Sequence, residues 1–134
     1  MTPARQPHRR ILIVDDAGET RAILSIALGA IADASVDATD NAEDALQYMT
    51  ETQADILITD VRMRGMSGLD LLRKLRERQC WPSCGAVVMS GETDPNLPGH
   101  ALACGANLFF SKPFSASEIR RSVISLLEAR DGAR

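Results

Sequence analysis

Five polar residues stand at or just after the end of short apolar runs, the pattern of buried strands that stop abruptly. They are Asp15, Asp16, Asp60, Ser90 and Lys112. Three of the five are carboxylates, and carboxylates brought together either bind a cation or keep one member protonated. Oxygen ligands of this kind suit a hard ion such as Mg²⁺, with Mn²⁺ as a substitute. The residue types therefore predict a divalent metal site.

The same residues could also carry out phosphoryl chemistry. An aspartate can act as a nucleophile toward phosphorus and form an acyl phosphate when charge on the transferred group is neutralised from several sides. Asp60 is the candidate phosphoacceptor, with Lys112 as the countercharge and Ser90 as a hydroxyl donor. Taken singly, each of these residues is more simply a helix cap, a turn residue or a solvated charge. Their shared position after four different strands favours the functional interpretation.

The elements that must position these residues alternate between short apolar runs and segments of helical periodicity. We expect strands at residues 10–14, 35–38, 55–59, 85–90 and 106–110, and helices at 19–32, 41–51, 68–78, 100–104 and 115–130. Parallel neighbours need crossover connections, and here these are helical, which predicts an α/β fold with a doubly wound, five-stranded parallel sheet. Ligands of such sheets bind outside the carboxyl ends of the strands, where all five polar residues would gather.

Apolar spacing also predicts details of the helices. The period of the first helix is carried by Ile23, Ile26, Ala27 and Ile31. Asn41 or Asp40 is the expected N-cap of the second helix, and an STxxE-like cap starts the fifth. Three residues at the start of the fourth helical segment, Pro95, Pro98 and Gly99, predict a helix that is short or starts late.

Length and composition limit the classes of protein. The 134 residues suit a single domain, and a net charge of −3 lacks the basic footprint of a nucleic-acid binder. No apolar stretch is long enough for a membrane span and no signal peptide is evident, so we expect a cytoplasmic protein that binds neither membrane nor nucleic acid. The cysteines, odd in number and without CxxC spacing, are expected to be free thiols.

Four segments resemble the receiver domains of bacterial response regulators: VDDAGETR, LITDVRMRGMSGLDLL, VVMSG and GANLFFSKPF. The resemblance runs from residue 9 to about residue 130, with an N-terminal tail (1–8) that is disordered or extended and a C-terminal tail (131–134). It implies a flavodoxin-like sheet with strand order 2-1-3-4-5, and a cis bond before Pro113.

The resemblance also implies a role for each site residue. Asp60 would accept the phosphoryl group. Metal ligands would be Asp60, Asp16, Asp15 through water, and the backbone carbonyl of Arg62. Contacts to the phosphoryl group would come from Ser90, Gly91 and Lys112, and the switch pair would be Ser90 with Phe109. Arg62 and Glu92, of opposite charge on neighbouring loops, would modulate hydrolysis of the acyl phosphate, and they could pair or point apart.

Three functions remain in competition. The leading hypothesis is a stand-alone receiver that takes its phosphoryl group from a histidine kinase or a histidine phosphotransfer protein. Its downstream protein target would bind the surface of the fourth helix, fifth strand and fifth helix. A second hypothesis is a pseudo-receiver that only binds proteins, without phosphoryl turnover. A third is a phosphohydrolase with an aspartyl nucleophile, but that class generally needs DxD after the first strand, and Ala17 stands at the third position.

Overall fold

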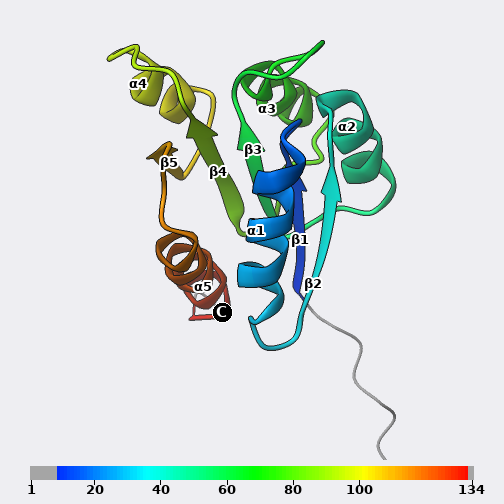
Figure 1. Cartoon of the computed structure of the whole chain (residues 1–134). Coiled ribbons are helices and arrows are strands. Elements are labelled where there is room, and N and C mark those ends of the chain that lie inside the picture. The colour runs from blue at the N-terminus through cyan, green and yellow to red at the C-terminus, as the bar shows by residue number, and fades with distance from the viewer. Residues whose placement is uncertain (1–8, 133–134) are drawn as a thin grey trace, which may run out of the picture.

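The backbone of residues 9–132, the part of the chain described by a computed structural model, alternates between strands and helices (Figure 1). The strands are β1 (Arg9–Val14), β2 (Ala34–Thr39), β3 (Ile56–Asp60), β4 (Gly85–Ser90) and β5 (Leu108–Ser111). The helices are α1 (Gly18–Gly29), α2 (Ala42–Glu51), α3 (Gly68–Glu77), α4 (Leu97–Ala103) and α5 (Ala116–Gly132). The predicted tail 1–8 lies outside the described residues, as do residues 133–134 of the second predicted tail.

The five strands form one sheet in the order β2-β1-β3-β4-β5, and every neighbouring pair is parallel. Helices α1 and α5 cover one face, and α2, α3 and α4 cover the other (Figure 1). This is the doubly wound, flavodoxin-like architecture that the sequence predicts. Its strand order reverses between β1 and β3, which is where ligands bind in such folds.

Two separate cores, one on each face of the sheet, follow from the alternation of side chains along a strand. In β1, Leu12 and Val14 pack with α2, α3 and α4, whereas Ile11 and Ile13 pack with α1 and α5. All residues of β3 and β4 are buried. The central strands are therefore held from both sides, and their carboxyl ends are fixed in space.

The buried face of α1 differs from the face that the spacing of Ile23, Ile26, Ala27 and Ile31 predicts. Leu24 and Leu28 are fully buried, whereas Ile23 is 48% exposed and Ile26 is 79% exposed. Ile31 is buried, but it lies beyond the helix, which ends at Gly29 and not at residue 32 as predicted. The discrepancy arises because α1 carries apolar residues on several sides, so the set 24, 28 and 31 satisfies helical spacing as well as the isoleucines do.

The predicted helix caps are present. The Asn41 side chain accepts a 2.7 Å hydrogen bond from the Asp44 backbone N–H at the start of α2. The Ser115 hydroxyl accepts one of 3.3 Å from the Glu118 N–H at the start of α5. Each cap satisfies a backbone donor that the first turn of a helix leaves without a partner.

Helix α4 is short, as predicted, with seven residues, although it begins at Leu97 rather than near residue 100. Pro98 lies in its first turn, where the missing N–H costs no hydrogen bond. Strand β5 starts two residues later than predicted; just before it, the Asn107 Oδ1 accepts a 2.9 Å hydrogen bond from the Ala86 N–H of the neighbouring strand. Within residues 9–132, none of the helices has the length and hydropathy that a membrane span would need.

Candidate functional site

The predicted site residues lie at one edge of the sheet. Asp60 and Ser90 are the last residues of β3 and β4, while Asp15 and Lys112 follow β1 and β5 directly. Because the strands are parallel and in register, these ends lie side by side; Asp60, for example, is paired with Met89. The fold thus brings together residues that are up to 97 positions apart in the sequence.

Three carboxylates form the centre of the site. Asp15, Asp16 and Asp60 each offer an oxygen, and these oxygens lie within 4.8 Å of one another. Asp15 is fully buried and Asp60 nearly so, while Asp16 is exposed. A set of carboxylate oxygens that is reached from solvent on one side fits a hard divalent cation that keeps some of its water. The residues therefore match the metal that the sequence predicts.

Asp15 is held by three different donors. Its Oδ1 accepts a 2.9 Å hydrogen bond from the Ala17 N–H, and its Oδ2 accepts one of 3.0 Å from Lys112 Nζ. The Arg21 guanidinium donates to the Asp15 backbone carbonyl at 2.8 Å. Sequence reasoning missed Arg21, although an arginine in the first turn of a helix after two aspartates was a usable signal. The hydrogen bond from Arg21 links α1 to the loop that carries Asp15 and Asp16.

Lys112 lies between two carboxylates. Its Nζ is 3.0 Å from Asp15 Oδ2 and 3.4 Å from Asp60 Oδ2. Burial raises the pKa of Asp60, as does the negative charge of Asp15, and the neighbouring ammonium of Lys112 only partly offsets these effects. Burial opposes the charged form of Lys112, but its hydrogen bond to Asp15 and its attraction to both carboxylates outweigh burial and raise its pKa. A metal ion would relieve the same repulsion.

The hydroxyl of Ser90 is turned into its own loop. It is almost fully buried, and its Oγ accepts a 3.0 Å hydrogen bond from the Glu92 N–H. The Ser90 carbonyl accepts from the Lys112 N–H at 2.8 Å. A Cβ added at Gly91 would lie 3.9 Å from the Lys112 Cβ, so this loop runs alongside the lysine. Ser90 and Gly91 therefore flank the carboxylates, with the serine hydroxyl occupied locally.

The two phenylalanines of β5 point to opposite faces of the sheet. Phe109 packs partly buried against the core that includes α4, and Phe110 packs partly buried against the core that includes α1 and α5. The alternation of side chains along a strand thus distinguishes the two rings. The peptide bond between Lys112 and Pro113 is cis, which confirms the expectation from the resemblance.

Helix α3 approaches the phosphoacceptor candidate very closely. A Cβ added at Gly68, the first residue of α3, would lie 2.0 Å from the Asp60 carbonyl oxygen. The same carbonyl accepts a 2.9 Å hydrogen bond from the buried Thr59 hydroxyl. Gly68 also donates its N–H to the Val61 carbonyl at 2.9 Å. Gly68 has no signal of its own in the sequence, because the close approach depends on tertiary packing.

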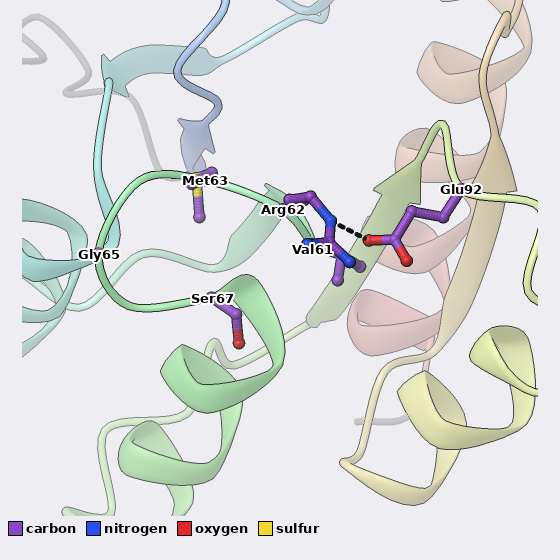
Figure 2. A pocket seen from close by; sticks show the side chains of 6 residues that line it. All are labelled: Val61, Arg62, Met63, Gly65, Ser67 and Glu92. Carbon is purple, nitrogen blue, oxygen red and sulfur yellow. Dashed lines mark hydrogen bonds and ion pairs between the residues drawn. The ribbon is translucent and has the colours of Figure 1, made fainter.

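A cavity of about 250 Å³ lies beside the end of β3. It is lined by Val61, Arg62, Met63, Gly65, Ser67 and Glu92. Figure 2 shows the side chains of Arg62 and Glu92 pointing toward each other across this cavity, joined by an ion pair of 2.7 Å. The hydrogen bond from Arg62 lowers the pKa of Glu92. Of the two arrangements that the sequence left open, the paired one is formed.

The fold and the carboxylate edge together define a receiver-type α/β module, and comparison with known proteins agrees. The family described as response regulator receiver domain matches residues 11–124, and the chain belongs to this family.

Individual relatives show the same relationship. The chain is 28% identical to the chemotaxis protein CheY of Pseudomonas aeruginosa, covering 92% of this chain and 99% of CheY. It is 32% identical to the sensor histidine kinase TmoS of Ectopseudomonas mendocina over 90% of this chain, but it spans only 12% of that protein's length. A CheY-like receiver domain from Methanospirillum hungatei has the same fold, with a TM-score of 0.84, 20% identity and coverage of 94% of this chain and 98% of that one.

Proposed function

We propose that this protein is a stand-alone response regulator whose domain, residues 9–130, accepts a phosphoryl group on Asp60. The observation that carries this proposal is the position of Asp60: it is nearly buried at the end of β3, has its oxygen within 4.8 Å of those of Asp15 and Asp16, and lies 3.4 Å from Lys112. A nucleophile for phosphorus needs this combination of a fixed carboxylate and nearby positive charge.

The transfer is a displacement at phosphorus. A carboxylate oxygen of Asp60 attacks the phosphorus of a phosphohistidine on a histidine kinase or histidine phosphotransfer protein, a P–O bond forms and the P–N bond breaks. The imidazole leaves and takes a proton from solvent. Lys112 would move from its ion pair with Asp15 toward the phosphoryl oxygens, where its charge compensates the one that is transferred.

The carboxylate cluster would hold a divalent metal, Mg²⁺ or in its place Mn²⁺, which when bound would supply further positive charge to the transferred group. Asp16, which is exposed, would bind the metal directly. Asp15 would bind it through water, and Asp60 and the Arg62 backbone carbonyl would complete the protein ligands. Ser90 and Gly91 would hydrogen-bond the phosphoryl oxygens from the loop after β4.

Phosphorylation would be read out by Ser90 and Phe109. A phosphoryl group on Asp60 adds acceptor oxygens, so the Ser90 hydroxyl would leave the Glu92 N–H and donate to it. The vacated space would admit the ring of Phe109, which is only partly buried against the core next to α4. The changed surface of α4, β5 and α5 would bind a downstream protein in the cytoplasm, without direct contact to nucleic acid or membrane.

The competing hypothesis of a pseudo-receiver predicts that no phosphoryl group is taken up. The decisive experiment incubates the full chain with Mg²⁺ and labelled acetyl phosphate, and then with purified, phosphorylated histidine kinases. We expect labelling of the wild type, none of Asp60→Asn, and no labelling when Mg²⁺ is chelated. An unlabelled wild type would support the pseudo-receiver, and a labelled Asp60→Asn would move the phosphoacceptor to another residue.

A further inference from the structure

A second cavity lies at the end of the sheet opposite the carboxylates. Its volume is about 390 Å³, and it is lined by Arg76, Gln79, Trp81 and Gly105; we call it the Trp81 pocket. These residues come from the end of α3, the loop before β4 and the turn after α4. The volume falls in the range of small-molecule sites. None of these residues takes part in the phosphoryl chemistry proposed above.

Gly105 keeps the Trp81 pocket open. Its φ is +107°, a conformation that other residues rarely adopt. A Cβ at this position would lie 3.0 and 3.1 Å from the Cη2 and Cζ2 atoms of Trp81, and 3.5 Å from Nη1 of Arg76. A side chain here would thus press on both the indole and the guanidinium. The backbone of Trp81 is held by a hydrogen bond from the Gln53 side chain to its carbonyl.

The polar side chains of the Trp81 pocket have no partners within the part of the chain that the structure describes. Neither the Arg76 guanidinium nor the Gln79 carboxamide forms a hydrogen bond or an ion pair there, whereas Arg73, one turn earlier on α3, is paired with Asp70 at 2.7 Å. N–H donors without a protein partner, placed beside an aromatic ring, can donate hydrogen bonds to the oxygen atoms of a bound ligand.

The charge around the pocket favours an anion. The last turn of α3 and its C-cap carry three basic residues, Lys74, Arg76 and Arg78, against one acidic residue, Glu77. A guanidinium binds a carboxylate through two parallel hydrogen bonds, which adds geometric selectivity to charge. The indole offers a flat apolar surface that a ring can contact.

We propose that the Trp81 pocket binds a small aromatic carboxylate. The carboxylate of the ligand accepts hydrogen bonds from the Arg76 guanidinium and from the Gln79 carboxamide. The ring of the ligand packs on the Trp81 indole. The site is separate from the phosphoacceptor, so its occupancy does not depend on the function proposed for Asp60.

The test uses the indole N–H signal of Trp81, the only tryptophan of the chain, in an NMR titration of the full protein without Mg²⁺ or phosphodonor. The probe is naphthalene carboxylate, compared with its neutral amide and with cyclohexanecarboxylate. We expect a saturable shift with the probe and binding of each comparison compound that is weaker by roughly tenfold or more, because the amide lacks the charge that the guanidinium pairs with and cyclohexanecarboxylate lacks the aromatic ring. No saturable shift, or equal binding of carboxylate and amide, would overturn the proposal.

Two variants sharpen the assignment. Arg76→Gln should weaken binding of naphthalene carboxylate roughly tenfold, whereas Arg78→Gln, at the same helix end but outside the pocket lining, should weaken it much less. If both substitutions weaken binding equally, the effect comes from the overall charge of the protein, and the proposed site is refuted. Gly105→Ala should abolish binding; if this variant is folded by circular dichroism and still binds normally, the pocket is wrong. If it does not fold, the Arg76 and Arg78 comparison decides.

Discussion

Arg62 Nε and Glu92 Oε1 lie 2.7 Å apart and join the loop after β3 to the loop after β4 at the mouth of the proposed phosphoacceptor site (Figure 2). The arginine is largely exposed, whereas the glutamate is only 28% exposed. Hydrolysis of an acyl phosphate on Asp60 requires water to approach in line with the bond that breaks. We expect a bridge between these two loops to hinder that approach.

We predict that the phosphoaspartate of the wild type is long-lived, and that shortening both side chains in Arg62→Ala with Glu92→Ala speeds its hydrolysis several-fold. The expected cause is easier access of the attacking water, because alignment of the reactants dominates such barriers. The measurement is the decay of labelled protein after the phosphodonor is removed.

The matched control for this prediction is the exposed pair Arg73 and Asp70 on α3, which has the same 2.7 Å separation but joins two residues of one helix instead of the two loops. Removing it should leave the decay rate unchanged. The two single variants, Arg62→Ala and Glu92→Ala, should each give most of the effect of the double variant, since they break one interaction. Unchanged or slower decay in the double variant would refute the idea that the Arg62–Glu92 pair hinders the attacking water.

A second prediction concerns stability and pH. Asp60 has a raised pKa in the folded protein, mainly through burial and then through Asp15, so folding favours its protonated form. Its contribution to stability is therefore present at acid pH and lost as the pH rises through the folded pKa. Asp60→Asn should raise the free energy of unfolding at neutral pH without metal, and this gain should shrink as the pH falls. Urea unfolding in a chelating buffer at several pH values measures it.

Metal should change this comparison. A ligand bound only by the folded state stabilises it by about 2.7 kcal/mol when present at 100 times its dissociation constant. Excess Mg²⁺ should stabilise the wild type more than Asp60→Asn, which lacks one of the three carboxylates. An equal Mg²⁺ response of both proteins would show that Asp60 is not a ligand, and a lower neutral-pH stability of Asp60→Asn without metal would contradict the raised pKa.

A third prediction follows from the contact between Gly68 and Asp60. Gly68→Ala would place a methyl group 2.0 Å from the Asp60 carbonyl oxygen, and overpacking of this kind costs about 1–3 kcal/mol. The displaced backbone would also slow phosphorylation by acetyl phosphate. Gly29→Ala is the control: a Cβ there meets nothing within 4 Å, so it should be neutral or stabilise by up to about 1 kcal/mol. If chemical denaturation shows similar stabilities for both variants, the close approach is wrong.

The last prediction uses Trp81 as a reporter. The residue lies in the loop between α3 and β4, at the end of the sheet opposite the carboxylates. Mg²⁺ at millimolar concentration should bind the carboxylates and yet barely change the fluorescence of Trp81. Binding itself can be followed by calorimetry in the same buffer. Strong quenching that tracks the calorimetric binding curve would mean that the two ends of the sheet are coupled.

The sequence determined the architecture and the location of the candidate site. Strand and helix alternate with clear periodicity, and a parallel sheet with helical crossovers is the arrangement that buries such runs on both faces. A residue that follows a parallel strand must lie at the carboxyl edge of the sheet. Asp15, Asp60 and Lys112 could for this reason be assigned to one site from their positions alone.

The tertiary structure decided how these and other side chains meet. That Lys112 is nearer to Asp15 than to Asp60, that the Ser90 hydroxyl bonds within its own loop, and that Arg62 meets Glu92 depend on several elements packing at once. The same holds for the buried face of α1, for Gly68 against Asp60, and for the Trp81 pocket. Local spacing fixes which end or side of an element a residue occupies, but distances between elements are set by close packing of the whole core, where shifts of less than an ångström decide contacts.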